Sequence, residues 1–465
     1  MNIRKTILQT VAFAVVLLLA VCAVQGPFGV DSDENFQRVR GFYTERKGSL
    51  DGVYIGASNV HEFWQPAVGW MSRGIAVYNF STSALPMQGV KYMVREARKT
   101  QPDALYIFNL NNFKSKKARA SIANLHRAVD YMPLSANKIG FINATAEKAG
   151  LSWKDRLELV FPVIRFHSRW STLQSWAYGN WDEQYKYFQL TDRFQHKSVD
   201  ISDKYITYGA RSELDGEVVR VFTDLLDYLD REHVNALFIK VPQVMKKQAI
   251  GRMNALEDMV KQRGYPCLDL LDRIDEMGLD LHRDYFDKGH TNIHGSWKIS
   301  KYIADYLAEQ YHFSDKRGQA DYALWDRSAQ TFDAVVDACL LPFERAVAPR
   351  AGLAAPVVAQ PKVGGGGVRL TWSASAGAEG YEIYRKRETE DGGQWRLLAE
   401  VDGDTTAFAD RDIENGAKYS YCVAAFLNRD GRRAYGDCDV NGVAVSTPEK
   451  GGASGDDSAA GGDQA

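Results

Sequence analysis

The fold of this chain is decided by the stretch Val53-Tyr-Ile-Gly-Ala-Ser58-Asn59. Its apolar residues predict a buried strand, and the small residues after them predict a tight turn that presents a serine. Similar apolar runs recur at 75–80, 104–110, 236–241 and 267–271, with helix-period segments at 87–100, 218–233 and 244–263. Strands that alternate with helices predict right-handed crossovers and an α/β domain built on a parallel sheet covered on both faces.

This alternation stops between about residues 114 and 214, where the chain is rich in aromatic residues. We interpret the segment as an insertion that folds against the sheet. Two roles are open for its rings, which either form the insertion's own core or stack on sugar rings. His167 and Trp170 lie here and are candidate substrate-binding residues, and the alternative for His167 is a hydrogen bond within the insertion.

The C-terminal third has a different character. Residues 346–355 are linker-like, 356–448 contain short alternating strands separated by turn residues, and 449–465 are too polar and simple to fold. Leu370-Thr-Trp372, Tyr381-Glu-Ile-Tyr384 and Gly416-Ala-Lys-Tyr419-Ser-Tyr421 resemble a fibronectin type III domain, which implies an all-β sandwich. Cys422 and Cys438 fall within it, and both a disulfide and two free thiols are open.

The first 26 residues carry a targeting signature, with Arg4 and Lys5 ahead of an apolar run from about Val11 to Val24. A retained signal anchor, a cleaved signal peptide and a lipoprotein modified at Cys22 are the alternatives. In each, the basic residues hold the N-terminus in the cytoplasm and the remainder is exported. We expect an extracytoplasmic protein tethered to the plasma membrane by an N-terminal helix, or else secreted.

Length and charge limit the classes of function. A chain of 465 residues exceeds what one core usually organises, which favours an α/β domain over 27–345 and a second domain after it. A net charge of −2 gives no field that would attract nucleic acid, so we exclude that partner. Neither metal-ligand spacing nor a glycine-rich phosphate loop occurs in the sequence, so we expect no metal and no cofactor.

A second segment, Asp287-Lys-Gly-His290, supplies the partners that a nucleophilic serine needs. A serine hydroxyl reacts once an imidazole accepts its proton, and that imidazole needs a carboxylate to fix its tautomer. We therefore predict Ser58 as nucleophile, His290 as general base and Asp287 as its orienting carboxylate, at the carboxyl edge of the sheet. The alternative for Ser58 is a helix cap. His294 is a competing histidine that we assign to capping or packing, before a helix expected to start near Ser296.

Residues 50 to 325 resemble the SGNH (GDSL-type) hydrolase superfamily, in particular its extracytoplasmic branch related to teichoic-acid D-alanyl-transfer and alginate O-acetylation proteins. The resemblance is carried by Gly56-Ala-Ser58, Tyr78-Asn79-Phe80, Gln101-Pro102-Asp103, Phe166-His167-Ser-Arg-Trp170 and the segment from Asp287 to Gly295. It implies a three-layer, flavodoxin-like sheet domain and an oxyanion hole. The implied donors are the Ser58 N–H, an N–H after the second strand and an asparagine after the third. Spacing favours Asn111, and Ser81 or Thr82 stands where the superfamily has a glycine.

Together these features predict a serine esterase or O-acyltransferase that acts on acyl esters of cell-envelope polysaccharides through an acyl-enzyme. Two alternatives are a non-catalytic surface protein for glycan binding or adhesion, and an assembly partner of a membrane-bound acyltransferase. Lys240, at the end of a buried strand, either points into the cleft or pairs with a carboxylate.

Overall fold

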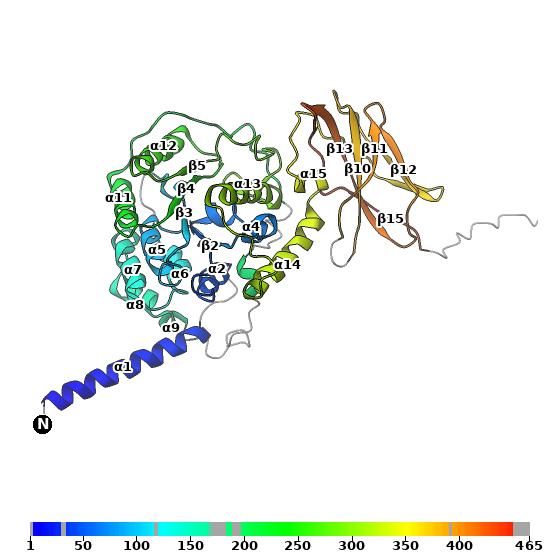
Figure 1. Ribbon diagram of the computed structural model, residues 1–465. Helices are drawn as coiled ribbons and strands as arrows, with labels where there is room; N and C mark the ends of the chain where they lie inside the picture. The colour runs from blue at the N-terminus through cyan, green and yellow to red at the C-terminus, as the bar shows by residue number, and fades with distance from the viewer. Residues whose placement is uncertain are drawn as a thin grey trace, which may run out of the picture. The chain divides into compact units, whose positions relative to one another are not determined.

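The computed structural model describes residues 3–28, 34–115, 120–166, 168, 183–187, 197–389 and 393–449 (Figure 1). The chain divides into two compact units, Met1–Asp333 and Ala334–Ala465. The division falls inside helix α14 (Ala323–Cys339), earlier than the expected end at residue 345. The first part of this helix belongs to the first unit because Trp325 packs against Trp70 there, with ring centroids 5.3 Å apart.

The first unit is built on a five-stranded sheet in the order β2-β1-β3-β4-β5, in which every pairing is parallel. Its strands are β1 (Gly52–Gly56), β2 (Val77–Ser81), β3 (Leu105–Asn109), β4 (Ala236–Lys240) and β5 (Cys267–Asp269). Every residue of the first four is buried. The predicted parallel sheet is confirmed, and its strand order is that of flavodoxin-like doubly wound folds.

Helices cover both faces of this sheet. Ile299, Ile303 and Leu307, spaced one turn apart on α13 (Ile293–Tyr311), join the strand residues in one core. On the other face Phe222 of α11 (Gly216–Arg231) packs edge-on against Phe238 of β4. Between the N-terminal helix and α14, the other described α-helices of the first unit outside the insertion are α2 (Glu34–Phe42), α3 (Ser58–His61), α4 (Pro66–Arg73), α5 (Val90–Ala97) and α12 (Lys247–Gln262).

The insertion is mostly helical where it is described. It contains α6 (Ile122–Val129), α7 (Ala136–Ala149), α8 (Trp153–Val160), α9 (Pro162–Phe166) and the short η5 (Glu183–Tyr187). Tyr187 packs against Tyr78 and Trp325, with centroids 6.0 and 4.0 Å apart, so this ring belongs to the core. His167 and Trp170, the candidate substrate-binding residues, lie outside the described residues.

The second unit contains an all-antiparallel β-sandwich. One sheet has the order β11-β10-β13-β14 with β15 also paired to β13, and the other has the order β12-β9-β8. The strands are β8 (Lys362–Gly364), β9 (Gly367–Thr371), β10 (Gly380–Arg387), β11 (Arg396–Asp402), β12 (Ala407–Asp410), β13 (Lys418–Arg429), β14 (Arg432–Tyr435) and β15 (Val443–Ser446). Cys422 and Cys438 are buried here and are not joined by a disulfide, and the hydrogen bond between their thiols, with burial, raises the pKa of Cys422.

The N-terminal segment forms one long helix, α1 (Ile3–Phe28). Residues Ile3–Val21 are long and apolar enough to cross a membrane, and none of that stretch is buried. A signal anchor and a signal peptide share these properties, so the helix fits both alternatives.

Candidate active site

Ser58 lies where strand β1 gives way to helix α3, at the carboxyl edge of the sheet. The chain turns sharply there, and a Cβ atom at Gly56 would come within 2.6 Å of Cγ2 of Val60. Glycine is therefore required at the strand end, because a larger residue would displace Val60. The turn leaves Ser58 half-buried as the first residue of α3.

Asp287 and His290 lie on a small hairpin that the sequence did not predict, formed by β6 (Tyr285–Asp287) and β7 (His290–Thr291). Helix α13 follows directly and begins at Ile293, earlier than the expected start near Ser296. The reason is Asn292, whose side chain accepts hydrogen bonds from the N–H groups of His294 and Gly295 at 3.1 and 3.2 Å. His294 is thereby buried in the first turn of α13.

The structure brings Ser58, His290 and Asp287 together. Oγ of Ser58 lies 2.8 Å from Nε2 of His290, and Nδ1 of His290 lies 3.0 Å from each carboxylate oxygen of Asp287. The ring of Phe286 stacks on the imidazole with centroids 5.3 Å apart. The side chains of His290 and Asp287 are 28% and 38% exposed, so a ligand in solution can reach the pair.

The electrostatics suit a general base. Burial raises the pKa of Asp287, but hydrogen bonds from His290 and from the Gly289 N–H outweigh it and leave that pKa below its usual value. An ionised Asp287 accepts a hydrogen bond and so places the imidazole proton on Nδ1. The lone pair of Nε2 then faces the hydroxyl of Ser58, as proton abstraction requires.

Asn111 lies in the turn after β3, but its side-chain amide is already engaged. Its Nδ2 donates to the carbonyl of Val241 and to Oε1 of Gln243, at 2.9 and 3.0 Å, and its Oδ1 accepts from the Val241 N–H. Both amide protons are thus used to hold the end of β4. The expectation that Asn111 donates to an oxyanion was wrong in this respect, because spacing along the chain does not reveal a side chain's partners.

The next residue has the free donor that Asn111 lacks. Nδ2 of Asn112 is buried and has no hydrogen-bond partner among the described residues. Asn112 follows Asn111 in the 3₁₀ turn η2 (Leu110–Phe113), directly after β3, which pairs with the strand that delivers Ser58. An unpaired buried amide is costly, and a ligand oxygen would satisfy it.

The Ser81 and Thr82 N–H groups, the two candidate oxyanion donors after the second strand, are not directed at Ser58. The Thr82 N–H donates to the carbonyl of Gly56 at 3.2 Å and is part of the sheet. Because successive amides of a strand point to opposite sides, the Ser81 N–H points away from β1. This corrects the expectation that the Ser81 amide faces Ser58.

His61, which the sequence analysis did not single out, lies one helical turn after Ser58. Its Nδ1 is 2.9 Å from Oγ of Ser81, which in turn donates to Asn79. Burial, together with the charges of Arg38 and His290, lowers the pKa of His61 well below its ordinary value, so this ring is neutral at neutral pH. The Ser-x-x-His spacing was the available signal.

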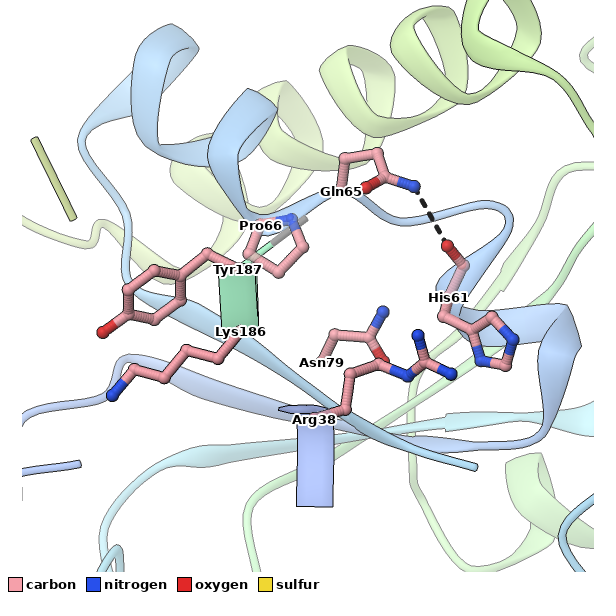
Figure 2. A pocket seen from close by; sticks show the side chains of 7 residues that line it. All are labelled: Arg38, His61, Gln65, Pro66, Asn79, Lys186 and Tyr187. Atoms are coloured by element: carbon pink, nitrogen blue, oxygen red, sulfur yellow. Dashed lines mark hydrogen bonds between the residues drawn. The ribbon is translucent and has the colours of Figure 1, made fainter. Parts of the chain in front are cut away.

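A small cavity lies beside His61 (Figure 2). Its volume of about 10 Å³ matches roughly one water molecule and is too small for an acyl group. The residues that line it are Arg38, His61, Gln65, Pro66, Asn79, Lys186 and Tyr187.

Lys240 does not serve the site. Its Nζ forms ion pairs with Glu257, at 2.6 Å, and with Asp269, which confirms the ion-pair alternative. Within the described ranges, no group of three or more His, Cys, Asp or Glu side chains is arranged to hold a metal ion.

Comparison with known proteins identifies the second unit. The fibronectin type III domain, SaeA third domain, matches residues 360–440, so the chain carries a fibronectin type III domain at its C-terminal end. An amylopullulanase of Thermoanaerobacterium saccharolyticum is 44% identical over 62 residues, which are 13% of this chain and 5% of that protein. The chain therefore matches only a small part of that relative.

Solved structures give matches of the same limited extent. The "FN3tt mut" structure covers 21% of this chain and all of its own, at 20% identity and a TM-score of 0.17. An Fn3-like protein from Clostridium thermocellum covers 22% of this chain and 96% of its own, at 22% identity and a TM-score of 0.16.

Proposed function

We propose that the first unit is an extracytoplasmic serine esterase or O-acyltransferase that acts on acyl esters of cell-envelope polysaccharides. The observation that carries the proposal is the continuous hydrogen-bonded chain from Ser58 through His290 to Asp287. Its geometry and order of groups are those of a serine nucleophile with an oriented general base. The resemblance of residues 50–325 to SGNH hydrolases supports the same chemistry.

The reaction follows from the roles of these groups. Nε2 of His290 takes the hydroxyl proton while Oγ of Ser58 attacks the ester carbonyl. The tetrahedral intermediate collapses, the C–O bond to the leaving alcohol breaks, and His290 returns the proton to that alcohol. Water or a second sugar hydroxyl then attacks the acyl-enzyme with His290 again as base, which gives hydrolysis or transfer.

The developing oxyanion needs donors. We assign them to the Ser58 N–H and to Nδ2 of Asn112, the buried amide without a partner in the described part of the chain. Loss of one such donor typically lowers the rate about 100- to 1000-fold. Asn112→Ala is therefore expected to slow acylation far more than Asn111→Ala does in molecules that remain folded.

The other parts of the chain suit a role at the cell envelope. Helix α1 has the length to tether the domain to a membrane. The fibronectin type III domain would space the catalytic unit from its surroundings or dock it on the polymer. A membrane-bound acyltransferase that supplies acyl groups is a candidate partner for the transfer reaction.

The test is intact-mass analysis of the protein without its N-terminal segment after exposure to a fluorophosphonate. We expect one adduct on the wild type and none on Ser58→Ala or His290→Ala. Folded wild-type protein that stays unlabelled would overturn the esterase proposal and favour a non-catalytic glycan-binding or assembly role. Co-purification from membranes would then test the assembly role.

A further inference from the structure

Gln243 occupies the space between the two halves of the candidate site. It lies just beyond strand β4, and only 4% of it is exposed. On one side it contacts the turn after β3 through Asn111 and Lys114, and on the other it contacts the hairpin that carries Asp287 and His290.

The contacts on the first side fix the orientation of the Gln243 amide. Its Oε1 accepts a hydrogen bond from Nδ2 of Asn111, at 3.0 Å, and another from Nζ of Lys114. Two donors on one side require an oxygen there, so the amide nitrogen must face the other way. Among the described residues no carboxylate pairs with Lys114, whose pKa burial lowers to about 8, so this amide oxygen is an important acceptor for its ammonium.

On the second side, Nε2 of Gln243 donates to the carbonyl of Gly289, at 2.5 Å. Gly289 directly precedes His290, and its own N–H donates to Oδ1 of Asp287 at 2.7 Å. The neighbouring Val244 N–H donates to the carbonyl of Lys288 at 2.9 Å. The segment after β4 therefore binds the tip of the hairpin through two successive carbonyl groups, those of Lys288 and Gly289.

We propose that Gln243 is a positioning residue that holds the Asp287–His290 hairpin at the distance Ser58 requires, and that Lys114 acts through it by orienting its amide. This inference rests on the proposed function. Gln243 touches no reacting atom, so its effect is on the alignment of His290. A misplacement of about 1 Å in such a site costs up to about 100-fold in rate.

Gln243→Glu separates hydrogen-bond donation from packing, since the two side chains have the same shape. Glutamate still accepts from Asn111 and Lys114 but cannot donate to Gly289. We expect the rate constant for fluorophosphonate labelling of the folded protein to fall about 10- to 100-fold, with a loss of melting temperature similar to that of the control variant below. Labelling of Gln243→Glu at the wild-type rate would overturn the proposal, because the side chain would then only fill space.

Gln101→Glu is the matched control. Gln101 is a fully buried glutamine that also bridges two segments, donating to Arg46 and accepting from Leu50, at the opposite edge of the sheet before β3 begins. We expect this variant to lose stability and to label at the wild-type rate when folded. Equal slowing of both variants would mean that any buried amide has this effect, which would contradict the assignment.

A double-mutant cycle tests the role of Lys114. Lys114→Met should slow labelling several-fold in the wild type and have almost no further effect in Gln243→Glu. Additive losses would show that Lys114 acts independently of Gln243.

The proton on Nδ1 of His290 gives a readout that needs no catalysis. Its downfield NMR signal reports the hydrogen bond to Asp287, so we expect it to shift or broaden in Gln243→Glu and to stay in place in Gln101→Glu. An unchanged signal would overturn the positioning role. If the signal responds while the wild type fails to label, the positioning role stands and the esterase proposal falls.

Discussion

The first unit contains two pairs of histidine and aspartate with nearly the same geometry and opposite surroundings. In the insertion, Nδ1 of His126 lies 2.8 and 2.9 Å from the carboxylate oxygens of Asp130, and the side chains are only 8% and 6% exposed. In the hairpin, His290 lies 3.0 Å from both oxygens of Asp287, and both side chains are open to solvent.

The difference teaches that a histidine with a carboxylate is not yet a catalytic site. The His126 pair joins one turn to the next within the end of α6 and stabilises the insertion. The His290 pair stands at the carboxyl edge of a parallel sheet, where Oγ of Ser58 lies 2.8 Å from Nε2 of His290. Placement and exposure distinguish the two, and the hydrogen bonds themselves do not.

The sharpest contrast is expected from Asp287→Asn and Asp130→Asn. Asparagine at 287 leaves the shape intact but no longer imposes the productive tautomer on His290, so the rate of fluorophosphonate labelling should fall about 10⁴-fold. Asp130→Asn should label at the wild-type rate per folded molecule. Time-resolved intact-mass analysis of the two variants measures both labelling rates. Similar slowing of both would contradict the distinction between the His290–Asp287 and His126–Asp130 pairs.

Stability should show the reverse order. His126→Ala leaves the buried Asp130 without its partner and should lower the free energy of unfolding by about 1–3 kcal/mol. His290→Ala removes a more exposed pair, which is worth about 0–1 kcal/mol. Urea unfolding at pH 7 compares the two. A larger loss of unfolding free energy for His290→Ala than for His126→Ala would mean that the His290–Asp287 pair contributes mainly to stability, which would contradict this contrast.

A smaller effect is expected in the pH dependence of stability. Burial raises the pKa of Asp130, more than its hydrogen bond to His126 lowers it, so the stabilising contribution of Asp130 is present at low pH and is lost as pH rises through its folded-state pKa. The pKa of Asp287 is lowered, so its contribution is present above its unfolded-state pKa, about 4, and is lost as pH falls through the folded-state value.

Thermal melts between pH 3 and pH 7 check these opposite signs. Relative to the wild type, Asp287→Asn should become less destabilising as pH falls below about 4. Asp130→Asn should become more destabilising over the same range. Shifts of the same sign for the two variants would contradict the contrast in their surroundings.

Sequence patterns predicted the sheet well because its strands are buried on both faces. The first four residues of β4, Ala-Leu-Phe-Ile at 236–239, are all apolar, as expected of a strand in a parallel sheet covered on both faces. The fibronectin strands were found from alternation and turn residues. Helix α2 (Glu34–Phe42) was not predicted, because most of its residues are polar and its few buried apolar residues, such as Val39 and Phe42, give no clear helical periodicity.

The candidate site was predictable in its reactive groups and not in its supporting contacts. Ser58, Asp287 and His290 could be assigned from their side-chain chemistry, because a hydroxyl, a carboxylate and an imidazole each suit one role in a serine nucleophile with its base. The roles of Asn111, Asn112 and Gln243 depend on which partner each amide faces. Their positions after the adjacent strands β3 and β4 do not give this information. The hairpin was also missed, because strands as short as His290–Thr291 leave no periodic signal.

The 232 positions that separate Ser58 from His290 along the chain impose an order in time. A polypeptide that is made from its N-terminus at roughly 5–20 residues per second contains Ser58, the proposed nucleophile, on the order of 10–50 s before His290, the proposed base. Throughout that interval the hydroxyl is an ordinary alcohol. A nascent or truncated chain is therefore chemically silent, and reactivity begins only when the segment around residue 290 docks beside a sheet that is already assembled.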